Sequence, residues 1–156
     1  MNIKILAVGK IKEKFSKDWI LEFEKRLSPY CSFSVTEIPA EPIFDENSYE
    51  KYKLIEGEKI LSQIKPDSYV ITLEIEGKTL SSQGFADKIE ELSSMGINEI
   101  TFVIGGANGL SQEVSGRADF KLSFSKMTFT HQMIRLILIE QIYRAFKIIK
   151  HENYHR

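Results

Sequence analysis

The sequence predicts an α/β fold in which helices cover a parallel β-sheet. Five short runs of strand-forming residues alternate with five helical segments along 156 residues, which is the usual order of a parallel α/β domain. Residues 99–104 are apolar on both faces in their second half, as expected for a central parallel strand. The length is typical of one domain, so we expect residues 1–156 to form a single domain.

The first strand and helix are predicted from residue type and spacing. Residues 2–8 form a mostly apolar run with the character of a strand. Large apolar side chains then recur every four residues, at Phe15, Trp19, Phe23 and Leu27. This period predicts one face of a helix that ends before Pro29, with Trp19 in the core.

Residues 31–65 add a strand, a loop and a second helix. Apolar and polar residues alternate over 31–38, which is the period of a strand, and two prolines favour a loop over 39–46. We expect a helix over 47–65, although Gly57 weakens that prediction. The apolar side of this helix would consist of Leu54, Leu61 and Ile64.

The second half of the chain continues the alternation. Residues 69–75 are rich in strand-forming residues, and a turn leads into a helix that Ser81 or Ser82 caps and Gly96 ends. The remaining predicted elements are a strand over 99–104, a glycine loop, a short helix from Ser111, a strand over 120–124, a loop over 125–130 and a long helix over 131–149.

The long helix carries two apolar stripes. One stripe consists of Ile134, Leu138, Ile142, Ala145 and Ile149, and the other of Leu136, Ile139, Tyr143 and Phe146. A helix that is apolar on two sides must cover both of them. One stripe would face the sheet, and the other favours a homodimer interface over burial in a monomer core.

Composition indicates an ordinary globular protein, with 42% hydrophobic and 28% charged residues. No run approaches the ~20 apolar residues of a membrane span, so no membrane partner is expected. A single cysteine, Cys31, excludes an internal disulfide, and the N-terminus lacks a secretory cleavage site. We therefore expect a cytoplasmic protein. One cysteine and three late histidines do not make a zinc ligand set, so no metal is expected.

The net charge of −1 conceals an uneven distribution. Basic residues exceed acidic ones in residues 1–30 and 121–156, whereas acidic residues dominate 31–120. Basic ends on a near-neutral chain favour a local anionic partner such as RNA, with solvated basic termini as the alternative. The first segments would contact phosphates through Lys10, Lys12, Lys14, Lys17, Lys25 and Arg26.

The stretch FVIGGANGLS, residues 102–111, ends an apolar strand at two adjacent glycines. Ligands of open α/β sheets bind beyond the carboxyl ends of strands, and glycine allows the main chain to approach a ligand closely. The loop does not match a Walker motif, because Leu110 follows Gly109, and its spacing differs from a dinucleotide fingerprint. A plain Asn-Gly turn is the structural alternative.

Two other bends, LEIEGK at 73–78 and SKMTFT at 125–130, also follow strands. If the three strands are parallel neighbours, their bends converge on one rim. Main-chain groups and small hydroxyls there, between apolar walls, would suit a nucleoside without a phosphate clamp. The wall residues would be Leu73, Leu110, Met127 or Phe129.

Several segments resemble one known family. VITLEIEGK, FVIGGANGL, LSFSKMTFTHQMIRLILIEQIYRAFKII and the closing YHR are similar to the ribosomal RNA large-subunit methyltransferase H family of the SPOUT superfamily. The resemblance covers essentially the whole chain. It implies a C-terminal trefoil knot, which general topology rules would not predict, S-adenosyl-L-methionine as cofactor, and a homodimer. The implied reaction is methylation at N3 of a pseudouridine in large-subunit (23S) ribosomal RNA on the assembled ribosome.

The resemblance also implies the site residues. The cofactor residues would be Leu73, Gly105, Gly106, Phe124, Ser125, Lys126, Met127, Thr128 and Phe129. The catalytic residues would be His131, Arg144 and His155, and the RNA contacts Arg135, Tyr154 and Arg156. The chain departs from the family pattern in the residues between its paired glycines and at Thr130, where proline is common.

The implied roles follow from the chemistry of an imide nitrogen. A histidine can accept the N3 proton near neutral pH, which makes His131 and His155 the candidate bases. A guanidinium, from Arg144 or Arg156, would stabilise the imide anion. The structural alternatives are a first-turn His131, pairing of Arg135 or Arg144 with Glu140, a surface Lys126 and a frayed tail. Two other functions stay open, a SPOUT enzyme acting on tRNA and a non-catalytic RNA-binding module of ribosome assembly.

Overall fold

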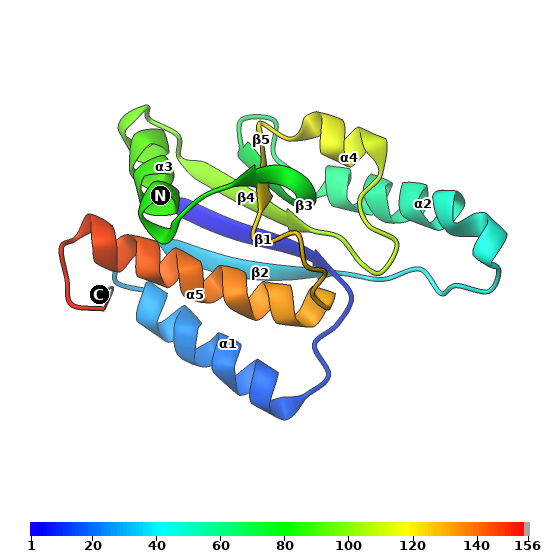
Figure 1. Ribbon diagram of the computed structural model, residues 1–156, viewed down its shortest axis with the longest axis horizontal. Helices are drawn as coiled ribbons and strands as arrows, with labels where there is room; N and C mark the ends of the chain where they lie inside the picture. The colour runs from blue at the N-terminus through cyan, green and yellow to red at the C-terminus, as the bar shows by residue number, and fades with distance from the viewer. Residues whose placement is uncertain (155–156) are drawn as a thin grey trace.

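Strands and helices alternate along residues 1–154, which the computed structural model describes (Figure 1). The strands are β1 (Asn2–Val8), β2 (Ser32–Ile38), β3 (Tyr69–Thr79), β4 (Glu99–Ile104) and β5 (Phe120–Ser123). The helices are α1 (Lys14–Leu27), the 3-10 helix η1 (Glu46–Ser48), α2 (Tyr49–Ser62), α3 (Ser82–Ser94), α4 (Gln112–Arg117) and α5 (His131–Ile149).

The strands form one sheet in the order β2-β1-β4-β3-β5, and their pairings are parallel. The predicted α/β fold with a parallel sheet is confirmed. β4 lies between β1 and β3, and every residue of β4 is buried, which explains why its sequence is apolar on both faces. Because the strands are parallel, their carboxyl ends lie along one edge of the sheet. The trefoil knot stays a prediction.

Helices cover both faces of this sheet. Along β1, Ile3 and Ile5 belong to a core shared with α1, α3 and α5, whereas Leu6 and Val8 belong to a smaller core shared with α2 and α4. This alternation is the period-2 pattern of a strand buried on both sides. Figure 1 shows α1 and α5 together below the sheet and α2 and α4 together above it.

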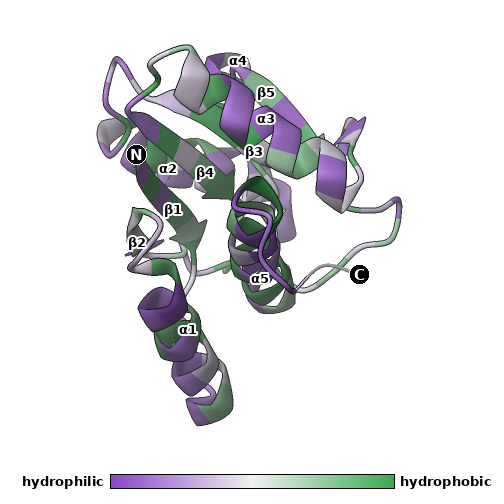
Figure 2. Cartoon of the chain, turned by 90° about the vertical axis from the view of Figure 1, so that its left-hand side faces the viewer, coloured by the Kyte–Doolittle hydropathy of each residue, from purple (hydrophilic) through white to green (hydrophobic). Residues whose placement is uncertain are grey.

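α5 is the main helix of the larger core, and both of its apolar stripes contribute to burial. Leu138 and Ile142 of one stripe are fully buried, and so is Ile139 of the other, while Phe146 is 7% exposed. The second stripe is therefore largely covered within the chain and does not by itself require a second subunit. Figure 2 shows α5 as mostly hydrophobic beside α1, which alternates hydrophobic and hydrophilic bands. No helix among residues 1–154, α5 included, could cross a membrane.

β3 is longer than the predicted strand 69–75. It continues to Thr79 because Lys78 and Thr79 return to pair with β5 after an irregular segment. Gly77 lies in this segment, and a Cβ built on it would lie 2.8 Å from the main-chain carbon of Leu122. Only glycine allows the β3 bend to press so closely against β5.

The helical period of α1 was predicted correctly, but its first apolar residue does not face the core. Phe15 is 72% exposed, whereas Phe23 and Leu27 are buried. Trp19 packs against the core, as predicted, and stacks on Phe23 with ring centroids 4.1 Å apart. Phe15 is therefore available to a ligand or to another chain.

α2 is shorter than the predicted helix 47–65, and of the predicted apolar side only Leu61 and Ile64 pack against the smaller core. Gly57 and Ile60 are buried, whereas Leu54 is 45% exposed. Gly57 lies where α2 meets Ser111, the N-cap residue of α4: a Cβ built on Gly57 would lie 3.1 Å from the Cβ of Ser111 and still closer to its hydroxyl. The glycine permits close packing of two elements and is not merely a weak point of the helix.

Replacing Gly57 with alanine should therefore destabilise the protein, although alanine is the better helix former. We expect a loss of about 1–3 kcal/mol in the free energy of unfolding, because Ser111 and α4 must move. Gly116→Ala is the matched control, since a Cβ on that helical glycine meets nothing within 4 Å. The control should be stabilising by up to about 1 kcal/mol. Urea denaturation of both variants tests this, and equal stabilisation by the two would contradict the packing argument.

Candidate functional site

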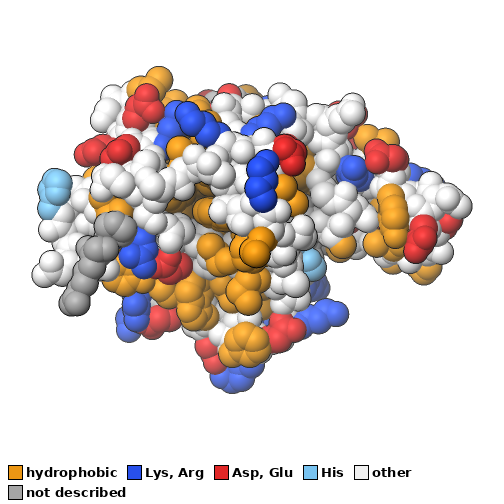
Figure 3. Space-filling view, viewed as in Figure 1, with side chains coloured by type: hydrophobic (Ala, Val, Ile, Leu, Met, Phe, Trp, Pro, Cys, Tyr) orange, Lys and Arg blue, Asp and Glu red, His pale blue; other side chains and the backbone are white. Residues whose placement is uncertain are grey.

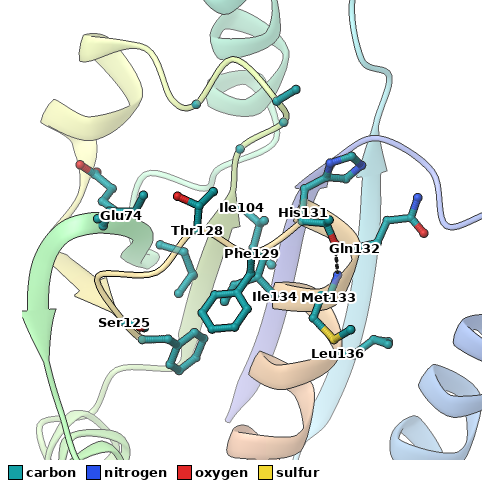
Figure 4. Close-up of a pocket in the computed structure, with 18 of the residues that line it drawn as sticks. Glu74, Ile104, Ser125, Thr128, Phe129, His131, Gln132, Met133, Ile134 and Leu136 are labelled. Carbon is teal, nitrogen blue, oxygen red and sulfur yellow. Dashed lines mark hydrogen bonds between the residues drawn. The ribbon is translucent and has the colours of Figure 1, made fainter.

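A cavity of about 950 Å³ opens at the carboxyl edge of β3, β4 and β5. Its walls come from residues 73–76 in the irregular part of β3, from the glycine loop after β4, from the loop after β5 and from the first turns of α5. Figure 4 shows Glu74 and Ser125 on one side of the cavity, His131 and Leu136 on the α5 side, and Phe129 between them. The three strand ends therefore converge on one rim, as expected from their order in the sheet.

The glycine loop is a tight turn that also forms part of the wall. Gly109 N donates to Gly106 O at 3.0 Å, and Gly109 has a φ of 76°, in the left-handed region that favours glycine. A Cβ on Gly105 would lie 3.0 Å from the main-chain carbon of Gly109, and one on Gly106 would lie 2.9 Å from Val8 Cγ1. The loop can hold this conformation only because these positions have no side chain.

The loop after β5 is held by its own hydroxyl groups. Met127 N donates to Ser125 Oγ at 3.0 Å, and Met133 N donates to Thr130 Oγ1 at 3.2 Å. Thr130 is therefore the N-cap of α5, which gives this departure from the family pattern a structural role. Met127 and Phe129 lie at the cavity mouth and are 74% and 39% exposed.

The charged residues of the lining are acidic. Among the described residues that line the cavity, Glu13, Glu74 and Glu76 are acidic and none is Lys or Arg. Glu74 accepts hydrogen bonds from Thr72 Oγ1 at 2.7 Å and Ser115 Oγ at 3.1 Å, which fix its carboxylate. Such a lining favours a cation and disfavours a phosphate group. Within residues 1–154, no three His, Cys, Asp or Glu side chains are grouped to hold a metal ion.

All but one of the predicted cofactor residues line this cavity. Those on its wall are Leu73, Gly105, Gly106, Phe124, Ser125, Met127, Thr128 and Phe129. Lys126 is not on the wall, since its side chain is 74% exposed and its Nζ lies 3.3 Å from Glu76 Oε2. An exposed ion pair of this kind contributes little free energy, so the structure favours the surface alternative for Lys126.

His131 lies on the cavity wall at the start of α5, close to the main chain of Gly9. If Gly9 had a Cβ atom, it would lie 3.0 Å from His131 Nε2. Burial, and to a smaller extent the positive charge of Arg135, hold the pKa of His131 below its ordinary value. Its imidazole is therefore neutral at pH 7 and is able to accept a proton.

Arg135 lies inside the protein rather than on an RNA-facing surface. Its side chain is fully buried, and Nη1 and Nη2 donate to Glu37 Oε1 and Gly9 O, each at 3.0 Å. Glu37 Oε1 also accepts from Ile11 N at 3.0 Å. This geometry does not fit the predicted RNA contact, because the guanidinium is withdrawn from solvent. Arg135 instead ties α5 to the ends of β1 and β2.

Arg144 and Tyr154 lie together at the other end of α5. The guanidinium of Arg144 contacts Glu140 Oε1 at 2.7 Å and lies 4.8 Å from the centroid of the Tyr154 ring. Tyr154 OH also donates to Glu140 Oε1, at 3.1 Å. Along the helix axis, Arg144 is about 20 Å from His131, so a single chain does not bring these two predicted residues together. The predicted residues His155 and Arg156 lie outside the described residues.

Two residues with clear roles were missed in the sequence. Glu74 lies in LEIEGK beside Glu76, and nothing in the local pattern marks it as the carboxylate that Thr72 and Ser115 fix. Glu37 ends a strand and has no helical spacing to Arg135 that would indicate an ion pair. Both roles depend on contacts between segments far apart in the chain.

Two comparisons with known proteins agree with this geometry. A family model described as "Predicted SPOUT methyltransferase" matches residues 1–155. A solved structure, described as that of a probable methylase family protein from Haemophilus influenzae Rd KW20, superposes with a TM-score of 0.55 at 14% sequence identity. The alignment covers 99% of this chain and 70% of that chain. At this identity the structural likeness concerns the fold alone.

The environment of His131 predicts the pH at which its imidazole titrates. We expect a pKa of His131 below the ordinary value of 6.5. NMR titration of the imidazole resonances measures this pKa, and the variant His131→Asn identifies the resonances that belong to His131. The pKa of His131 is lower in the folded protein than in the unfolded chain. Its contribution to the free energy of unfolding is therefore fully present at a pH above the unfolded-chain pKa, and it is lost as the pH falls through the folded-state pKa. A pKa at or above the ordinary value would contradict the buried position of the ring.

Proposed function

The chain belongs to the SPOUT methyltransferase family, and from that premise we propose that it methylates N3 of a pseudouridine in large-subunit (23S) ribosomal RNA, using S-adenosyl-L-methionine. The family supports a methyltransferase, and the choice of nucleotide rests on the resemblance of the segments quoted above. The observation that carries the proposal is the cavity at the carboxyl edge of the sheet. It combines three main-chain bends with an apolar and acidic lining.

The cavity residues fit the proposed methyl donor. S-adenosyl-L-methionine would supply the methyl group from a positively charged sulfonium centre. The carboxylates of Glu13, Glu74 and Glu76 favour a cation. Because Gly105 and Gly106 have no side chain, the loop lies close against Gly109 and Val8 and its main chain borders the cavity. The cavity volume of about 950 Å³ lies within the usual range for small-molecule sites.

The residues of the wall also suit the chemistry of methyl transfer. Positive charge is lost from the donor during the reaction, so apolar walls such as Ile104 and Phe129 favour the transition state over the bound reactant. His131, neutral at pH 7, accepts the proton that leaves the imide nitrogen. The bends contribute by holding the reacting groups in line, which accounts for most of the rate enhancement in reactions of this kind.

We propose a homodimer, because the predicted catalytic residues lie at opposite ends of α5. A partner chain, docked with the C-terminal end of its α5 at the cavity mouth, would bring Arg144 and Tyr154 of one chain to His131 of the other. Exposed apolar side chains provide a surface for this association: Phe15 is 72%, Met127 74% and Met133 51% exposed. Figure 3 shows hydrophobic side chains gathered near the N-terminal ends of α1 and α5.

RNA would approach this site along the basic segment that precedes and begins α1. Lys10, Lys12, Lys14 and Lys17 are exposed, and Glu13, Phe15 and Ser16 of the same segment line the cavity. Basic side chains at the rim would contact phosphates and hold the RNA over a cavity that is itself acidic. The ribosome as partner and a cytoplasmic location belong to this same proposal.

Methyl transfer to ribosomes tests the proposed function. Purified protein and labelled S-adenosyl-L-methionine are incubated with assembled ribosomes, free large-subunit RNA or tRNA, and the modified nucleoside is identified by mass spectrometry. We expect label on a pseudouridine of the large-subunit RNA, and most of it with assembled ribosomes. Label on tRNA would favour the tRNA enzyme, and no label with any RNA would favour a non-catalytic RNA-binding protein.

The dimer makes a separate prediction. Met133→Glu should dissociate the protein into monomers that remain folded, because it places a charge on a half-exposed apolar surface that we assign to the interface. Met95→Glu is the matched control, since Met95 is also exposed but lies outside this surface. Sedimentation velocity distinguishes the two. A wild-type monomer at all concentrations, or equal behaviour of both variants, would remove the dimer from the proposal.

A further inference from the structure

A buried carboxyl group lies behind the glycine loop, on the face of the sheet opposite α5. Glu56, on α2, is 3% exposed. Its Oε1 accepts a hydrogen bond from Glu41 N at 3.0 Å, whereas its Oε2 is buried with no hydrogen-bond partner. A Cβ built on Gly106 would lie 3.6 Å from this Oε2. The unpaired oxygen therefore faces the main chain of the loop that lines the cavity.

The position of Glu56 relative to the cavity is defined by the loop between them. Gly106 lines the cavity, whereas Glu56 does not. A Cβ on Gly106 would point toward Val8 and Glu56, which lie beneath the loop. α2 reaches this position because Gly57, the next residue, allows close packing against Ser111 at the far end of the same loop. Figure 1 shows α2 and α4 together on this face of the sheet.

An unpaired buried carboxylate is costly, so this group is either neutral or bound to a donor. The charged groups that act on it are Glu41 and Lys59, and Lys59 Nζ is itself paired with Glu41. Burial is the main effect and raises the pKa of Glu56, while the hydrogen bond from Glu41 N partly offsets this and the negative charge of Glu41 adds to it. In its protonated form the carboxyl group carries an O–H donor, and Oε2 lies beside Gly106 of the glycine loop.

We propose that Glu56 is a positioning residue for the cofactor loop: Oε1 anchors the segment before α2 through Glu41 N, and Oε2–H donates to the main chain of residues 105–107 when the cavity is filled. The proposal rests on the proposed function, because it assigns a role in holding the methyl donor. Glu56 does not touch the reacting atoms. It acts by holding the cavity wall in place from behind, because a shift of the loop would change the shape of the cavity.

Three variants test this role. Glu56→Gln keeps an acceptor for Glu41 N and supplies an amide N–H₂ in place of the hydroxyl donor. Glu56→Ala removes both groups. Glu58→Gln is the matched control, because Glu58 lies on the same helix but is exposed. For each variant and the wild type, affinity for S-adenosyl-L-methionine is measured by calorimetry from pH 4.5, the ordinary pKa of a glutamate, up to pH 8.5. Amide hydrogen exchange of residues 105–110 is measured in the free and the ligand-saturated protein.

We expect Glu56→Ala to bind about tenfold more weakly than the wild type and to exchange its glycine-loop amides faster. Glu56→Gln and Glu58→Gln should bind like the wild type at low pH. As pH rises through the raised pKa of Glu56, wild-type affinity should fall relative to that of Glu56→Gln, which has no proton to lose. His131 titrates in both proteins, so the ratio of their affinities isolates Glu56.

The outcomes separate this inference from the proposed function. If Glu56→Ala keeps the affinity and the exchange rates of the wild type, the positioning role is overturned. It is also overturned if Glu56→Gln and Glu56→Ala lose affinity equally, because that result would indicate that an anion is required. If the wild type does not bind S-adenosyl-L-methionine, the proposed function fails. Hydrogen exchange in the free protein then decides alone, because Glu56 already lies behind Gly106 before the donor bond forms. Faster exchange confined to Glu56→Ala supports the positioning role, and unchanged exchange overturns it.

Discussion

The candidate site depends on the close approach of main chain to main chain at the glycine loop. A Cβ on Gly105 would lie 3.0 Å from the main-chain carbon of Gly109, and one on Gly106 would meet the buried side chain of Val8 at 2.9 Å. Any side chain at these positions would push the loop away from β1 and into the cavity. The absence of side chains therefore sets the volume of the cavity and leaves peptide groups on its wall. Together with the acidic lining, this arrangement suits a neutral nucleoside better than a highly charged phosphate.

The edge of the sheet is fixed from both faces by buried charged residues that are not part of the cavity lining. On the α5 face, Arg135 ties Gly9 and Glu37 together and holds the first turn of α5, which carries His131. On the α2 face, Glu56 accepts a hydrogen bond from the segment before α2 and lies behind the glycine loop. Burial of each charged group costs desolvation free energy. Each group lies next to a loop whose position the sheet alone does not fix. We interpret them as the supports of the site.

Much of the fold could be predicted because it depends on local residue patterns. The period of α5 and the hydroxyl cap of α3, expected at Ser81 or Ser82 and found at Ser81, are set by neighbouring residues. The short helix predicted from Ser111 begins at Gln112, with Ser111 as its N-cap. The convergence of the three bends followed from the parallel order of the strands. The roles of Gly57, Glu37 and Glu56 could not be predicted, because each depends on a partner brought close only by the completed fold. The second stripe of α5 was assigned to a partner chain because no local pattern shows that α1 would cover it.

The central claim is that the glycine loop forms the binding surface for S-adenosyl-L-methionine, and a calorimetric titration with this ligand tests it most directly. The wild type should bind, and Gly106→Ala should bind at least about tenfold more weakly, because the added methyl group forces the loop to shift. Gly84→Ala, where the nearest atom to the new Cβ would be Ser81 Oγ at 3.4 Å, should bind like the wild type. No heat of binding in the wild type, or equal affinity in Gly106→Ala and the wild type, would contradict the account.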